Sequence, residues 1–325
     1  MSTANVVQDL RDDGAEPWFV SALERLPRGD EQSLEPYLTL VGEATALPNT
    51  LATCRFHYVR VDPQGNPRVQ ALVNMLTDRI VDYCVPRSRI NEAFRLAEIT
   101  KSTDSFLKLQ REAKELFANV STTGEGGELL LYALLEMSLG LPQILCKMPL
   151  KTNSQMHSHG VDGVHARALP DGKLAVYYGE AKMHRTVTTA IDAVLESLAP
   201  YLLDVGNGMA QRDILLLRDN LDAGDAELTA ALARYFTEGA MEASQLVVRG
   251  ACLVGFSLGD YSSPQNADAS IRGEVAEAMN GWRARLVTAI TNKRLTRFEL
   301  EIFLVPLPSV QDFRDEFLRS LGLAK

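Results

Sequence analysis

The sequence predicts an α/β protein in which a mixed central sheet is flanked by helices. From residue 123 onward, the apolar pattern gives a helix, three strands, a second helix, and then further helices and strands. The chain has 325 residues, of which 46% are hydrophobic, so it can bury one large core or two modest ones. It contains no internal repeat and no low-complexity tract.

Three regions are expected along the chain. Residues 1–50 form an acidic N-terminal arm, with nine acidic and three basic residues, and we expect this arm to be irregular and partly ordered. Residues 51–120 form an α/β to helical region. Residues 121–325 form the main α/β domain, which carries the most informative residues.

The patterns before residue 120 are mainly helical. Residues 53–62 alternate apolar and polar side chains, which is typical of a half-buried strand. Apolar residues recur at helical spacing over 69–83 and over a longer region, 88–119, which we expect to break near 102–104. A mainly helical N-terminal region therefore follows a single strand.

The elements after residue 121 have stronger signals. The stretch from Leu129 to Met137 is apolar nearly all round, so it predicts a buried helix with Glu128 in its first turn. The strongly apolar run from Leu246 to Leu258 predicts a buried strand. The other expected elements are strands at 143–150 and 297–306, a hairpin around 170–172, and helices at 188–203, 224–238 and 271–292.

The hairpin has a turn that sets its register. Pro170-Asp171-Gly172 suits a type I turn closed by a glycine in the left-handed region, which gives a three-residue loop. In that register Asp162 faces Glu180, and Lys182 lies on the same side of the sheet two residues further on. A two-residue loop would move Asp162 to the opposite face.

This placement predicts a metal site. Directly opposed residues have Cβ atoms about 4.5–5.5 Å apart, where two carboxylates repel unless a cation lies between them. Oxygen ligands from Asp162 and Glu180, completed by water, suit Mg²⁺. Lys182 is then placed to orient a water molecule or to stabilise charge on a phosphate. The alternative is a surface ion pair on an edge hairpin, with Glu128 simply favouring a helix dipole.

The charge distribution bears on partners. A net charge of −9 argues against a protein that binds nucleic acid without a partner. Basic residues gather near the C-terminus, either as a solvated helix face or as an edge that contacts phosphates: Arg283, Arg285, Lys293, Arg294 and Arg297.

Several other classes of protein are disfavoured. No apolar run approaches the roughly 20 residues that span a membrane, so we expect no membrane partner and a cytoplasmic location. The four cysteines are widely scattered, which favours reduced thiols over a zinc ribbon or a disulfide framework. No GxxxxGK[ST] motif for nucleoside triphosphates is present.

A helix with an early Glu, then strands carrying Asp and Glu-x-Lys, resembles the core of PD-(D/E)xK nucleases. Glu128, Asp162, Glu180 and Lys182 match that pattern, with Val161 in place of the proline that names the motif. More narrowly, Gly-Val-Asp162-Gly-Val-His-Ala and Tyr-Gly-Glu180-Ala-Lys182 resemble the DUF1837 (HamA) family, which contains the nuclease subunit of the Hachiman anti-phage defence system.

The resemblance implies a metal-dependent DNase that acts with a superfamily 2 helicase (HamB-like), which holds it inactive until DNA is engaged. It implies Mg²⁺, with Mn²⁺ as a substitute, bound by Asp162 and Glu180 with Glu128 in support. Lys182 would position the attacking water. The alternative is a catalytically inactive nuclease-like module that docks and regulates a helicase, or senses DNA.

Overall fold

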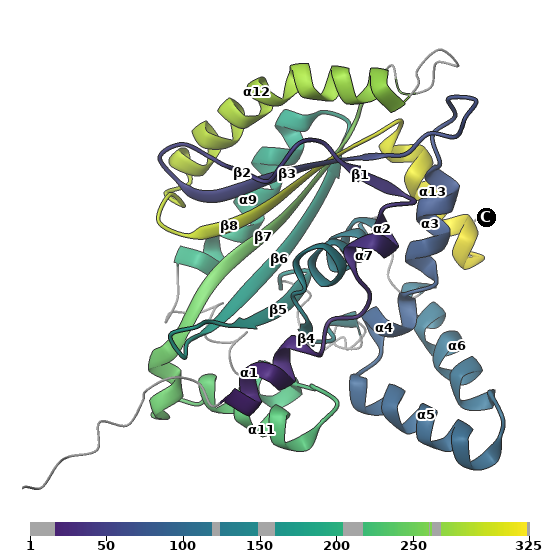
Figure 1. The fold of residues 1–325 in the computed structure, drawn as a ribbon, viewed down its shortest axis with the longest axis vertical. Coiled ribbons are helices and arrows are strands. Elements are labelled where there is room, and N and C mark those ends of the chain that lie inside the picture. Colours follow the sequence, from purple (N-terminus) through teal and green to yellow (C-terminus); the bar gives the residue numbers. More distant parts are fainter. Residues whose placement is uncertain are drawn as a thin grey trace, which may run out of the picture.

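A computed structural model describes residues 17–118, 124–148, 160–203, 217–259, 261 and 268–323. Within them, eight strands form one mixed sheet in the order β1-β3-β8-β7-β6-β5-β4, with β2 paired to β3 (Figure 1). The strands are β1 Leu38–Leu40, β2 Thr45–Ala46, β3 Leu51–Val59, β4 Gln143–Leu145, β5 Gly163–Ala168, β6 Leu174–His184, β7 Leu246–Ser257 and β8 Glu299–Leu307.

The centre of the sheet is parallel and its two ends are antiparallel. Strands β3, β8, β7 and β6 run parallel to one another. Strands β1 and β2 pair antiparallel with β3, β5 pairs antiparallel with β6, and β4 pairs antiparallel with β5. The central strands β6 and β7 are long apolar runs, which is typical of strands that helices cover on both faces. The α/β fold class with a mixed sheet flanked by helices is thereby confirmed.

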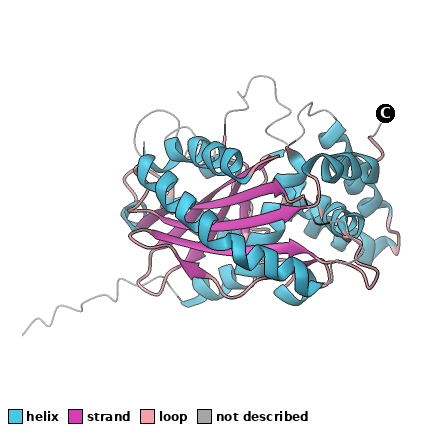
Figure 2. Cartoon of the chain, turned by 90° about the horizontal axis from the view of Figure 1, so that it is seen from above, coloured by secondary structure: helices cyan, strands magenta, loops and turns pink. Residues whose placement is uncertain are grey.

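Helices lie on both faces of the sheet (Figures 1 and 2). On one face, Tyr178 of β6 packs against Tyr201 of α9, and α12 lies beside α9. On the other face, α7 packs on β6 and β7, with α3 and α13 behind it. The main helices are α3 Val69–Thr77, α4 Ile80–Cys84, α5 Arg87–Thr100, α6 Asp104–Ala118, α7 Glu125–Ala133, α9 Val187–Leu203, α11 Ala226–Tyr235, α12 Asp268–Asn292 and α13 Val310–Leu321.

Helix α7 is buried along its whole length, as its sequence predicts. Glycines allow this close packing, since a Cβ at Gly127 would lie 2.9 Å from the sulfur of Met183 on β6. A Cβ at Gly126 would lie 3.0 Å from the Phe313 ring on α13. The helix continues into a π-helix, η1 Leu134–Ser138. The first turn of α7 is therefore held close to the sheet.

Two expected elements differ from the structure. The helix expected over 69–83 is divided into α3 and α4, because the chain turns at Asp78 and Arg79. Buried residues keep helical spacing across that turn, so the apolar pattern does not reveal it. The strand expected over 143–150 is shorter, since β4 ends at Leu145 after a register shift and residues 149–150 lie outside the described part.

The N-terminal arm is more regular than its sequence predicts. The described part, from residue 17, contains α1 Pro17–Glu24, α2 Glu31–Leu34, β1 and β2. Phe19 and Leu23 of α1, for example, are buried in the core. Elements of two to eight residues are too short for a periodic pattern to reveal them.

The division into 1–50, 51–120 and 121–325 stays a prediction. One pairing bears on it directly: β3, from the second region, runs parallel to β8, from the third. The two regions therefore contribute strands to the same sheet.

The loop of the β5–β6 hairpin has the conformation that its sequence predicts. The Leu169 N–H donates to the Lys173 carbonyl at 2.8 Å, and the Gly172 N–H donates to the Leu169 carbonyl at 3.0 Å. Gly172 has φ +81°, in the left-handed region. The ladder pairs Val164 with Tyr178, as the three-residue loop requires, so the predicted register is confirmed.

Gly172→Ala is expected to destabilise the protein, because a Cβ in the left-handed region costs roughly 1–2 kcal/mol. The free energy of unfolding in urea measures this loss. Gly281→Ala is the matched control: Gly281 lies within α12 with open space around it, so alanine there should be neutral or stabilising. Equal effects at the two positions would show that the φ of Gly172 does not control the loop.

Candidate active site

The open end of the β5–β6 hairpin brings Asp162 beside Glu180. The ladder ends at the pair Gly163 and Gly179, and Asp162 lies one residue beyond it. The Asp162 N–H donates to the Gly179 carbonyl at 2.7 Å, and Oδ2 of Asp162 accepts the Ala181 N–H at 2.8 Å. Asp162 therefore contacts the residues on both sides of Glu180, and its carboxylate is half-buried.

Glu180 and Lys182 form an ion pair at this end of β6. The Lys182 Nζ donates to Glu180 Oε1 at 2.5 Å, and Glu180 is only 4% exposed. Burial raises the pKa of Glu180, while the charge of Lys182 and hydrogen bonds from Lys182 and Ser197 oppose that rise. Ser197 belongs to α9, so a helix on this face of the sheet contributes to the site.

Lys182 remains charged in this environment. Burial alone would lower the pKa of Lys182, but the charges of Glu180, Asp162 and Glu128 raise it above its usual value. A lysine with a raised pKa is protonated at neutral pH. Lys182 is therefore a hydrogen-bond donor and a positive charge here, not a base.

Glu128 approaches the cluster from the first turn of α7. Its charge raises the pKa of Glu180 and of Lys182, which places it within electrostatic range of both. Oε2 of Glu128 accepts a hydrogen bond from the Tyr83 hydroxyl at 2.9 Å. Burial, followed by the charges of Glu128 and Asp162, holds the pKa of Tyr83 well above its usual value, so the phenol stays protonated. The structure thus brings all four predicted residues together.

Tyr83 and Ser197 are members of the site that sequence reasoning missed. Tyr83 lies in an apolar helical pattern, so the sequence predicts only that its ring is buried. The hydrogen bond from its hydroxyl to Glu128 is visible only in the three-dimensional structure. Ser197 lies in the middle of α9 and carries no motif.

Tyr83→Phe is expected to destabilise the fold by about 1–3 kcal/mol, because it removes a buried hydrogen bond to a carboxylate. Urea unfolding measures the loss. Tyr235→Phe is the control, since the Tyr235 hydroxyl donates a longer, 3.3 Å bond to the Gly172 carbonyl, which is uncharged. A loss at Tyr83 no larger than at Tyr235 would show that the bond to Glu128 contributes little.

The cluster fits a divalent cation in its chemistry but not in its present geometry. Carboxylate oxygens are the ligands that Mg²⁺ prefers, and Asp162, Glu180 and Glu128 supply them. In the described ranges, however, no group of three or more His, Cys, Asp or Glu side chains is placed to hold a metal ion. The acids bond instead to Lys182, Tyr83 and the Ala181 N–H.

Two of the five residues in the basic cluster near the C-terminus pair with acidic residues. Arg285 on α12 pairs with Asp192 on α9, and Lys293, the residue after α12, pairs with Glu196 on α9. Arg283 donates to the Thr45 hydroxyl at 2.9 Å. These contacts favour a solvated helix face that ties α12 to α9 over an edge that contacts phosphates.

Fold and site together define an α/β protein in which a hairpin and the start of a buried helix bring three carboxylates and a lysine together. A family model for HamA matches residues 36–321, and the chain belongs to the HamA family. Membership of this family suggests a role in anti-phage defence. No curated protein matches the chain significantly. None of the helices in the described ranges is both long and apolar enough to cross a bilayer.

Proposed function

We propose that this chain is a metal-dependent DNA nuclease with a PD-(D/E)xK core, the effector subunit of an anti-phage defence complex. The observation that supports this most is the hairpin register, which sets Asp162 beside Glu180 and Lys182. Glu128 adds a third carboxylate from α7. The pKa values of Glu180 and Lys182 are both shifted here, and such shifts cluster at functional sites.

The residues have distinct roles in phosphodiester hydrolysis. Asp162 and Glu180 would hold Mg²⁺, and Glu128 would support them. Bound there, the ion would supply a Lewis acid for a phosphate oxygen and lower the pKa of its water. Lys182, charged at neutral pH, donates hydrogen bonds that orient the attacking water or stabilise charge on the phosphate.

The proposal includes a superfamily 2 helicase partner. The chain carries a net charge of −9, and ion pairs occupy Arg285 and Lys293 of its basic cluster. An acidic nuclease of this kind gains access to DNA most readily when another protein delivers the strand. A partner that withholds DNA also keeps the nuclease inactive until it is needed.

A second candidate function is a catalytically inactive module that docks and regulates a helicase or senses DNA. The internal partners of the acids favour it: Glu180 is paired with Lys182, and Glu128 bonds to Tyr83. In this case the cluster stabilises the fold and has no metal requirement.

One experiment separates the two candidates. The chain is purified with and without a superfamily 2 helicase as the proposed partner, and plasmid and linear DNA are incubated with Mg²⁺ or with EDTA. A nuclease degrades DNA with Mg²⁺ and is inactive in EDTA. Tight association with the helicase, without cleavage under any of these conditions, would instead establish the inactive module. Discrete fragments in place of general degradation would indicate sequence-specific cleavage.

A further inference from the structure

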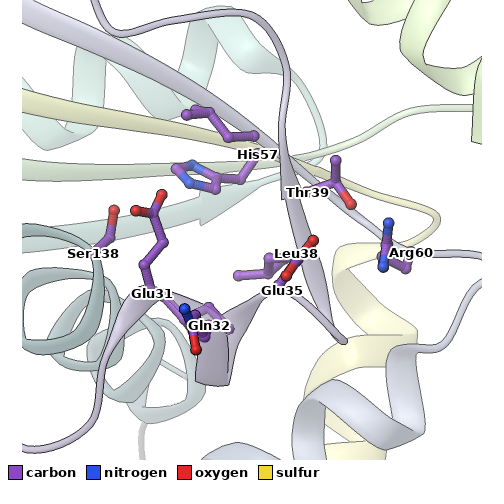
Figure 3. Close-up of a pocket in the computed structure, with 10 residues that line it drawn as sticks. Glu31, Gln32, Glu35, Leu38, Thr39, His57, Arg60 and Ser138 are labelled. Atoms are coloured by element: carbon purple, nitrogen blue, oxygen red, sulfur yellow. The ribbon is translucent and has the colours of Figure 1, made fainter.

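A pocket of about 400 Å³ lies between α2 and the edge strand β1 (Figure 3). We call it the α2–β1 pocket. Helix α2 contributes Glu31, and Glu35 follows as its C-cap residue. Strand β1 contributes Thr39, β3 contributes His57, and Ser138 comes from the end of η1. None of these residues belongs to the cluster of Glu128, Asp162, Glu180 and Lys182. The volume lies in the range of small-molecule sites.

His57 is a buried group with an unused hydrogen-bonding atom. It is 4% exposed, and its Nδ1 has no hydrogen-bond partner in the part of the chain that the structure describes. Burial and the charge of Arg55 lower the pKa of His57 to about 4, so the ring is neutral at pH 7. A buried polar atom without a partner is costly, and a ligand in the pocket would relieve that cost.

The charges around His57 indicate what kind of ligand fits. Glu31 and Glu35 are exposed carboxylates at the rim, and no ion pair involving either is found within the described ranges. The carboxylate of Glu31 points toward the imidazole of His57 in Figure 3. Arg60 also lines the pocket, but Figure 3 places it on the other side of β1 from these two groups. The half of the pocket around His57 is therefore negative.

We propose that the α2–β1 pocket binds a small organic cation, an ammonium or guanidinium group on a short carbon chain. The cationic group donates to Glu31 at the rim and to the imidazole of His57 behind it, while Leu34 and Leu38 contact its carbon chain. A neutral imidazole offers one acceptor nitrogen, which matches an N–H donor. A metal ion fits less well, because the described acids and histidines include no group of three placed for one.

The test is isothermal titration calorimetry of the full chain with agmatine, which carries a guanidinium and an ammonium on a four-carbon chain. One saturable site with a Kd tighter than about 1 mM is expected. Glu31→Gln should weaken binding by at least about tenfold, because a charge-assisted hydrogen bond is lost. His57→Phe should weaken it similarly. Glu31 is exposed, so its variant decides the matter even if His57→Phe does not fold.

Glu43→Gln is the matched control, since Glu43 is an exposed acid of the same N-terminal region outside the pocket. It removes the same charge and should leave the affinity unchanged. Absence of saturable binding would overturn the proposal, as would equal weakening by Glu31→Gln and Glu43→Gln. Tighter binding of glutarate, a dianion of similar length, would overturn the assignment of ligand charge.

Discussion

Asp162→Ala and Glu180→Ala are each expected to abolish Mg²⁺-dependent DNA cleavage. Each variant removes a carboxylate from the open end of the hairpin. The loss should be at least about 100-fold, the scale seen when a single charge-stabilising group is removed from an active site. Cleavage of linear DNA by the chain together with the proposed helicase partner measures it.

Lys182→Ala should abolish cleavage while leaving metal binding intact, because Lys182 is a donor and not a ligand. Calorimetry with Mn²⁺ follows binding separately from cleavage. Without Lys182 the pKa of buried Glu180 rises further, so metal binding by this variant should strengthen as the pH is raised. Lys173→Ala is the control, since Lys173 pairs with Asp171 at the exposed loop of the same hairpin.

Full cleavage activity in all three site variants, with the partner present, would show that these residues do not form the active site. Loss of activity in Lys173→Ala as well would point to damage to the hairpin rather than to chemistry. The two patterns are distinguishable because the loop and the open end lie at opposite ends of β6.

The hairpin shows why part of this site was predictable from the sequence. Its loop is local, so Pro170, Asp171 and Gly172 determine the register, and the register determines which residues share a face. Strand and helix periodicity likewise predicted the buried α7 and the apolar β7. Turn type and periodicity depend only on residues that are close together in the sequence, so they can be predicted from it.

The missed features depend on contacts between distant segments. Tyr83 donates a hydrogen bond to Glu128, which lies 45 residues further along the chain, and no periodic pattern predicts such a contact. Short elements such as α1 and β1 are ordered because the core lies beneath them, not through their own propensity. The sequence favoured a metal ion between the acids and kept an ion pair with Lys182 as the alternative, and the structure shows that Lys182 pairs with Glu180.

Arg87→Met is expected to destabilise the protein by about 3–5 kcal/mol, because it breaks a buried ion pair and leaves a charge behind. Arg87 donates to Oε1 of Glu136 at 3.1 Å, and the Glu136 side chain is fully buried in η1. Glu136 also accepts the backbone N–H groups of Arg28, at 2.5 Å, and Gln143, at 2.7 Å. One carboxylate therefore joins the segment before α2, the start of α5, η1 and β4.

Urea unfolding measures this loss, and Arg89→Met on the same helix is the control. Arg89 pairs with Glu112 at the surface, with half of its side chain exposed, so its removal should cost under about 1 kcal/mol. The double variant Arg87→Met with Glu136→Gln should recover part of the loss, since it removes the uncompensated charge but keeps an acceptor. No recovery would show that packing of the Arg87 side chain dominates over charge.

The pH dependence of the Arg87→Met effect follows from Glu136. Burial raises the pKa of Glu136 above its usual value, and the charge of Arg87 opposes that rise. Because the pKa of Glu136 is higher in the folded protein than in the unfolded chain, Glu136 contributes stability that is complete below its unfolded-state pKa. That stability is lost as the pH rises through its folded-state pKa.

Arg87→Met removes the opposing charge and so raises the folded-state pKa of Glu136 further. The stabilising contribution of Glu136 is then lost over a wider range of pH. The destabilisation should therefore be small near pH 4, where Glu136 is protonated in both proteins, and grow toward about pH 8. A loss independent of pH would show that Glu136 does not carry the charge that Arg87 compensates.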